Sequence, residues 1–146
     1  ATLNLLQPLI EQLQEFKTNA DFTLLFRYLN AAENIFETNK YIEIYAKILD
    51  TKSFQDLNKL TQLTINLADA YFNSANYQQA LIQYWKIILN YESKEFREYS
   101  LYKIIECYIK TNNHKNAKKQ FDKLKTDFPN SQYLEKLNAS IQSLKE

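Results

Sequence analysis

The chain carries one histidine and one cysteine, the side-chain types that most often act as metal ligands or nucleophiles. His114 falls in a predicted turn between two helices, and Cys107 falls within a predicted helix. A zinc site needs several such ligands, and a cysteine nucleophile needs a neighbouring base, which the sequence does not indicate. We therefore predict no catalytic residue, no metal site and no cofactor. We expect His114 to pack against or cap the turn, and Cys107 to be a buried or half-buried thiol.

Three glutamates, Glu92, Glu95 and Glu98, recur at steps of three residues, as a pair of catalytic carboxylates would on a helix. We expect these carboxylates to form a solvated helix face and not a catalytic pair. The chain also contains no glycine, which excludes the glycine-rich loops that cradle phosphates. These observations argue against an enzyme.

Five lysines crowd a short stretch of the second half of the chain: Lys115, Lys118, Lys119, Lys123 and Lys125. The formal net charge of the whole chain is +1, which creates no strong preference for nucleic acid. We therefore expect a solvated outer face of a helix. The alternative is weak binding of this Lys115–Lys125 helix to an anionic surface or to nucleic acid.

The composition predicts that helices position these side chains. The chain has 146 residues, enough for one domain with a sizeable core, and its 45% hydrophobic content is ordinary for a soluble globular protein. It has no glycine, no valine and only two prolines, so helix breakers are rare and a principal strand former is missing. We predict an all-α fold.

One pattern occurs twice between residues 64 and 129. The first copy has Thr64, Leu67, Ala68 and Tyr71 followed by Ala80 and Tyr84, and the second has Leu101, Ile104, Ile105 and Tyr108 followed by Ala117 and Phe121. The offset between the copies is 117 − 80 = 37 residues. A period in this range, with helical spacing inside each unit, is typical of an array of helix pairs.

These residues resemble the tetratricopeptide repeat (TPR) family, which places an aromatic, a leucine, a small residue and a tyrosine on one helix, then an alanine, an aromatic and a proline on the next. The second copy closes with Pro129, where the first has Glu92, and Thr64 and Leu101 replace the family's tryptophan. The period also exceeds the family's 34 residues. The resemblance implies a TPR-like right-handed α-solenoid of about eight antiparallel helices with a C-terminal capping helix.

The resemblance divides a single domain, 1–146, into an N-terminal helix (1–20), a degenerate repeat (21–52), two repeats (54–92 and 94–129) and a capping helix (130–146). Within the two repeats and the cap, we predict helices over 53–74, 76–91, 95–111, 114–127 and 131–144. The last of these turns Leu134, Leu137, Ile141 and Leu144 inward, and so covers the apolar flank that a repeat stack exposes at its end.

In a TPR array, the residues of each first helix that face away from its partner helix line a concave groove. The register places there Ile65, Asp69, Phe72 and Asn73 from one repeat and Tyr99, Tyr102, Glu106, Ile109 and Lys110 from the next. The degenerate repeat would add Phe26, Leu29, Glu33, Phe36 and Glu37. Apolar and aromatic residues rimmed by acids suit a peptide or helix of a partner protein. The alternative is that neighbouring helices, the N-terminal one included, fill the groove.

The segment 127–133 also resembles TPR modules of bacterial envelope proteins, such as those of the Tol-Pal system and of outer-membrane protein assembly. This resemblance implies a non-enzymatic protein–protein interaction module or scaffold in the bacterial envelope or periplasm. The cytoplasm is the alternative location, and a regulatory domain of a larger protein is the alternative role. The chain starts at Ala1 and contains no methionine, so we expect a longer precursor and membrane contact only through an upstream anchor.

Overall fold

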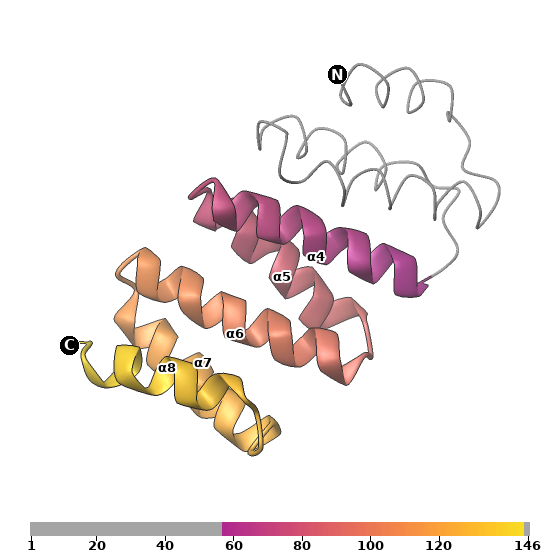
Figure 1. Cartoon of the computed structure of the whole chain (residues 1–146). Helices are drawn as coiled ribbons and strands as arrows, with labels where there is room; N and C mark the ends of the chain where they lie inside the picture. The colour runs from indigo at the N-terminus through magenta and orange to yellow at the C-terminus, as the bar shows by residue number, and fades with distance from the viewer. Residues whose placement is uncertain (1–56, 145–146) are drawn as a thin grey trace, which may run out of the picture.

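The structure, a computed structural model, describes residues 57–144. These residues form five helices and no strand (Figure 1). The helices are α4 (Leu57–Asn73), α5 (Tyr77–Asn90), α6 (Lys94–Lys110), α7 (His114–Asp127) and α8 (Tyr133–Gln142). The all-α prediction is therefore confirmed for this part of the chain. The eight-helix, right-handed solenoid stays a prediction, because the N-terminal helix and the degenerate repeat lie outside the described residues.

Helices α5 to α8 begin and end within two residues of their predicted limits, because local signals set their ends. The side chain of Ser93 accepts a hydrogen bond from the Phe96 N–H at 3.5 Å, and Asn113 does the same for Asn116 at 3.5 Å. Helix α8 starts at Tyr133, two residues later than predicted, and the Ser131 hydroxyl accepts the Tyr133 N–H at 3.2 Å.

The two helix pairs bury the same positions, 37 residues apart. Ala80 and Ala117 are both fully buried, as are Ile87 and Leu124 further along the same two helices. The small alanine side chains let each second helix lie close to the first helix of its pair. The period that the sequence shows is therefore a period of core packing.

The helices lie in two rows. Helices α4, α6 and α8 form a first row, in which α4 contacts α6 and α6 contacts α8. Helices α5 and α7 form a second row behind it (Figure 1). Each helix also packs against the next one along the chain, so the elements stack in sequence order. Residues far apart in the sequence therefore meet mainly along the first row.

Each helix pair turns through one residue in the left-handed conformation, Ala75 with a φ of 61° and Asn112 with a φ of 58°. In both turns the next amide, that of Asn76 or Asn113, donates at 2.8 Å to the carbonyl five residues earlier. This is the Schellman arrangement, which satisfies carbonyls at the end of a helix. Glycine usually occupies the left-handed position, and this chain, which has none, uses Ala and Asn.

We expect Ala75→Gly to raise the free energy of unfolding by about 0.5–1 kcal/mol. The left-handed conformation costs a residue with a β-carbon roughly 1–2 kcal/mol, and the greater freedom of glycine in the unfolded chain cancels part of that gain. Asn112→Gly is the matched control and should gain less, because asparagine tolerates this conformation. Urea unfolding of both variants measures the difference. A less stable Ala75→Gly protein would show that the turn is not strained.

Candidate functional site

Asp69 of α4 is held by tyrosines from two other helices. The hydroxyl groups of Tyr84 on α5 and Tyr99 on α6 both donate to its carboxylate, the second at 2.9 Å to each oxygen. Burial raises the pKa of Asp69, against the effect of these hydrogen bonds and of nearby Lys103. Burial and the Asp69 charge also raise the pKa of both tyrosines, so their hydroxyls stay protonated as donors. Asp69 therefore ties three helices together.

Tyr99 also belongs to a group of aromatic rings that joins α6 to α8. The rings of Tyr102 and Tyr133 stack with centroids 4.3 Å apart and planes 7° from parallel. Tyr99 meets both edge-on, at 6.3 Å and 6.2 Å. Edge-to-face and stacked pairs of this kind are stabilising contacts. The three tyrosines Tyr99, Tyr102 and Tyr133, which we call the tyrosine cluster, hold the start of α8 against α6.

Two more predicted groove residues lie on α4. The Phe72 ring is half-buried, meets Tyr77 edge-on at 5.3 Å, and lies 3.5 Å from the Lys103 ammonium, a cation–π distance. Ile65 is only 4% exposed and belongs to the core. Phe72 therefore presents part of its ring beside α6, whereas Ile65 has almost no surface for a partner to contact.

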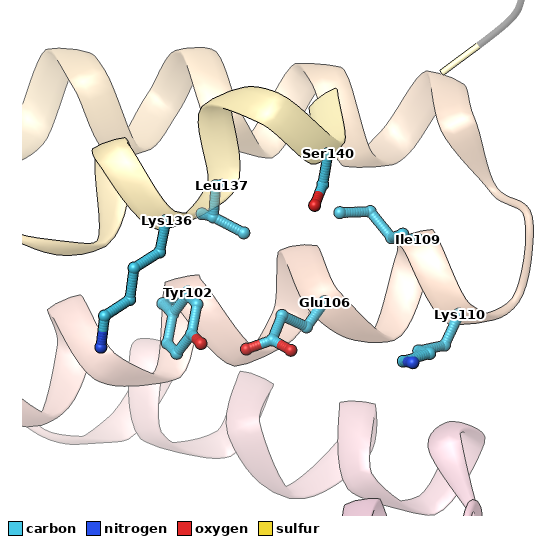
Figure 2. Close-up of a pocket in the computed structure, with 7 residues that line it drawn as sticks. All are labelled: Tyr102, Glu106, Ile109, Lys110, Lys136, Leu137 and Ser140. Carbon is cyan, nitrogen blue, oxygen red and sulfur yellow. The ribbon is translucent and has the colours of Figure 1, made fainter. Parts of the chain in front are cut away.

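A cleft of about 200 Å³ opens between α6 and α8 (Figure 2). We call it the α6–α8 cleft; its lining residues are Tyr102, Glu106, Ile109, Lys110, Lys136, Leu137 and Ser140. Figure 2 shows the Glu106 carboxylate turned towards Tyr102, with Lys136 at one end of the cleft and Lys110 at the other. Apolar walls, one carboxylate and two hydroxyl groups thus border one small space, with a lysine at each end.

The polar groups of the cleft carry both signs of charge. Burial raises the pKa of Tyr102, and the nearby Glu106 carboxylate raises it further. Lys110 and Lys136 are exposed at the two ends of the cleft. The cleft can therefore offer both signs of charge to a bound side chain.

The cysteine and the histidine do not line the α6–α8 cleft. Cys107 is fully buried, as expected, and burial raises its pKa to about 12. No group of three His, Cys, Asp or Glu residues that could hold a metal occurs between residues 57 and 144. His114 is the first residue of α7. The three glutamates do not share a helix face as predicted, because Glu92 lies in the extended connection before α6.

Of the nine residues of the two repeats predicted to line the groove, the structure brings Tyr102, Glu106, Ile109 and Lys110 together in the cleft. The tyrosine cluster and the Lys103 contact connect them to Tyr99 and Phe72. The sequence reasoning missed Lys136 and Ser140, which reach the cleft from α8. Their only signal was position: both lie on the capping helix beside its inward-facing leucine, Leu137, with Lys136 one residue before it and Ser140 three residues after it.

One family comparison bears on the helix pair that carries most of the cleft. Residues 99–131 match a family model described as tetratricopeptide repeat, which supports a repeat of this kind over α6, α7 and the turn before α8. No curated protein and no solved structure matches the chain. Tetratricopeptide repeats generally mediate protein–protein interactions, and their stacks present extended binding surfaces. The match is consistent with a non-enzymatic scaffold.

Proposed function

We propose that this chain is a protein–protein interaction module that holds a segment of a partner protein along the first row of helices, α4, α6 and α8. The α6–α8 cleft is the observation that carries this proposal. Its volume of about 200 Å³ is below the roughly 300–1,000 Å³ of small-molecule pockets. A space of this size suits one side chain of a partner better than a cofactor.

The lining of the cleft indicates how the partner is held. An apolar portion of its side chain would pack against Ile109 and Leu137. A polar tip or the neighbouring peptide groups would meet Glu106, Lys110 and Lys136 around the rim. A buried apolar anchor surrounded by a polar rim is the usual anatomy of a protein interface.

The rest of the predicted groove extends this surface towards α4. Tyr99 and Phe72 offer partly exposed rings for additional contacts, whereas Asp69 acts by holding Tyr99 in place. We leave Ile65 out of the proposed surface because it is buried. The partner segment would then run from α8 across α6 towards α4.

Filling the cleft should block the partner without disturbing the fold. Ser140 is exposed and lines the cleft, so Ser140→Phe is expected to occupy the space and weaken partner binding at least about tenfold, as loss of a central anchor does. Ser140→Ala is the matched control, with binding within about twofold of wild type, because it leaves the space and the apolar walls of the cleft unchanged. The partner is first recovered by affinity capture with the unaltered full chain, and binding is then measured by calorimetric titration.

The two variants distinguish partner binding in the cleft from partner binding at another surface. If Ser140→Phe keeps its melting temperature and binds the partner like wild type, the partner does not use the cleft and the proposal fails. If Ser140→Ala weakens binding as strongly as Ser140→Phe, the hydroxyl itself is the contact, and the anchor side chain assumed here is wrong.

We further propose that the partner belongs to a bacterial cell-envelope complex. The support is the resemblance of segment 127–133 to TPR modules of envelope proteins. Fractionation of cells that express the full-length protein tests this. Recovery in the cytoplasmic fraction alone would contradict it.

A further inference from the structure

The outer side of α5 carries an apolar stripe that faces solvent. Leu89 is 76% exposed and Ile82 is 48% exposed, and these two are the large hydrophobic residues that the described region exposes. Trp85, half-buried, lies between them in sequence. Steps of three and four residues place all three on one side of the helix. Single exposed hydrophobics are common, but a stripe of three on one helix marks a contact surface.

The matching side of α7 is polar and partly basic. The offset of 37 residues places Lys119, Asp122 and Thr126 at the positions of Ile82, Trp85 and Leu89, and Lys123 at that of Lys86. Because the two helix pairs bury the same positions, these equivalent residues project from the same side of the second row. We call this side, made of the exposed residues of α5 and α7, the outer face.

The charge of the outer face is strongly one-sided. Among the exposed residues of α7, four lysines stand against two aspartates, a net charge of +2, and Lys86 of α5 adds one more positive charge. Lys115, Lys119 and Lys123 are exposed. Lys125 pairs with Asp122 at 3.5 Å. The outer face therefore joins an apolar half to a cationic half.

We propose that the outer face docks this module onto an anionic lipid bilayer. Ile82, Trp85 and Leu89 would enter the headgroup region, and the lysines of α7 would lie over the lipid phosphates. Side chains of these two kinds, side by side, characterise protein surfaces that bind the membrane interface. No described helix is both long and apolar enough to cross a membrane, so the contact would be peripheral.

Two other occupants of the outer face fit less well. A nucleic acid would use the lysines, but the exposed Ile82 and Leu89 add nothing to phosphate contacts and cannot stack on bases as aromatic rings do. A second copy of the chain would bring two faces of the same positive charge together. Of these three partners, the bilayer is the one that would contact both the apolar half and the cationic half of the outer face. Because the cleft opens between helices of the first row, a partner protein and the membrane could be bound together.

The chain contains its own probe, because Trp85 is its only tryptophan. We expect the fluorescence of the full chain to shift to shorter wavelength with vesicles of phosphatidylcholine and phosphatidylglycerol, as the exposed part of the half-buried Trp85 ring leaves water. The chain should also sediment with these vesicles. Vesicles of phosphatidylcholine alone should cause neither the wavelength shift nor the sedimentation of the chain. Added salt should weaken binding to the anionic vesicles because it screens the lysines.

Substitutions on the outer face separate its two halves. Ile82→Ser with Leu89→Ser should lower vesicle partitioning at least about tenfold, since two exposed apolar side chains no longer enter the interface. Lys119→Gln should lower it about fivefold, and Lys119→Gln with Lys123→Gln about 25-fold. Lys94→Gln, an exposed lysine at the start of α6, is the matched control and should bind like wild type. Circular dichroism checks that each variant keeps its helices.

Three results would overturn the proposal. The first is the absence of both the wavelength shift and sedimentation. The second is a loss with Lys94→Gln as large as that with Lys119→Gln, which would show unspecific attraction by total charge. The third is tighter binding to duplex DNA or RNA than to vesicles, with no effect of the Ile82 and Leu89 substitutions. That result would assign the lysines to nucleic acid.

Discussion

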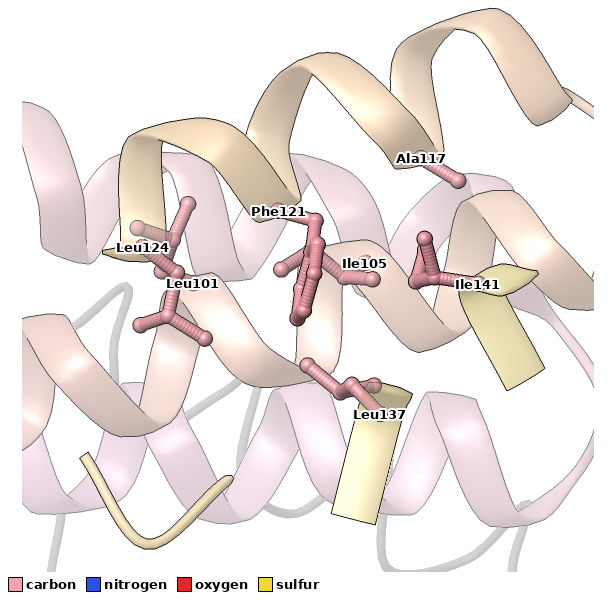
Figure 3. Packing of buried hydrophobic residues seen from close by; sticks show 7 residues of the cluster. All are labelled: Leu101, Ile105, Ala117, Phe121, Leu124, Leu137 and Ile141. Atoms are coloured by element: carbon pink, nitrogen blue, oxygen red, sulfur yellow. The ribbon is translucent and has the colours of Figure 1, made fainter. Parts of the chain in front are cut away.

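Removal of α8, by ending the chain after Asn130, is expected to take away most of the stability of the protein. Leu137 and Ile141 are 2% and 8% exposed, and they pack into one cluster with residues of α6 and α7 (Figure 3). Phe121 of α7 points into the space that they close. Loss of one such side chain costs about 2–5 kcal/mol, and small domains have only about 5–15 kcal/mol in total. The truncated chain should therefore unfold or aggregate through its exposed core.

Single substitutions on α8 make this prediction quantitative. Leu137→Ala should lower the free energy of unfolding by about 2–5 kcal/mol in urea melts. Asn138→Ala, the exposed neighbour, should change it by less than about 0.5 kcal/mol. A truncated chain that stays monomeric with an unchanged melting temperature would show that α8 is not part of the core.

Asp69→Ala should lower the free energy of unfolding by about 3 kcal/mol. The carboxylate accepts hydrogen bonds from two tyrosines, and each hydrogen bond to a charged group contributes roughly 1.5–3 kcal/mol. Tyr84 is fully buried, so its hydroxyl would be left without an acceptor and without water. Tyr99 is half-buried and can turn its hydroxyl to solvent, which moderates the loss.

A double-mutant cycle tests whether the effect arises from the hydrogen bond. Tyr84→Phe alone should cost about 1.5–3 kcal/mol, and in the Asp69→Ala background it should cost much less, because the acceptor is already gone. Tyr71→Phe is the control, since Tyr71 does not bond to Asp69. Additive losses from Asp69→Ala and Tyr84→Phe would contradict the structure at this point.

Asp69 should also leave a signature in the pH dependence of stability. Its folded pKa is raised above the ordinary 3.8, so folding disfavours its charged form. Stability from this group is therefore fully present below 3.8 and is lost as the pH rises through the raised pKa. The difference in unfolding free energy between wild type and Asp69→Asn should become more favourable to wild type as the pH falls. A difference that does not change with pH would mean that the carboxyl is not desolvated.

Much of the local structure could be predicted from the sequence because it depends on neighbouring residues. Helical spacing places Leu67, Ala68 and Tyr71 on one face whatever they pack against. A second copy 37 residues later, with Ala117 and Phe121, repeats the same faces. The absence of glycine and valine from the sequence also indicates that the repeating unit is made of helices. Helix positions and core residues followed from these short-range patterns.

Asp69 and Ile65 show what the periodic pattern of the sequence could not predict. Register predicted that both face a groove. In the structure the packing of α6 against α4 brings Tyr99 onto Asp69, 30 residues away in sequence, and Ile65 is buried in the core. The helical period of the sequence determines on which face of its helix a side chain lies. It does not determine which distant residue packs against that side chain.

The α6–α8 cleft depends on tertiary structure in the same way. The sequence by itself determined that a last amphipathic helix covers the repeat stack, since Leu137 and Ile141 need a core to enter. It did not determine that Tyr133 stacks on Tyr102, or that Lys136 and Ser140 border the cleft beside Glu106. These contacts depend on how far α8 is shifted and rotated against α6. Packing of many side chains at once sets that shift, and no single residue or spacing in the sequence encodes it.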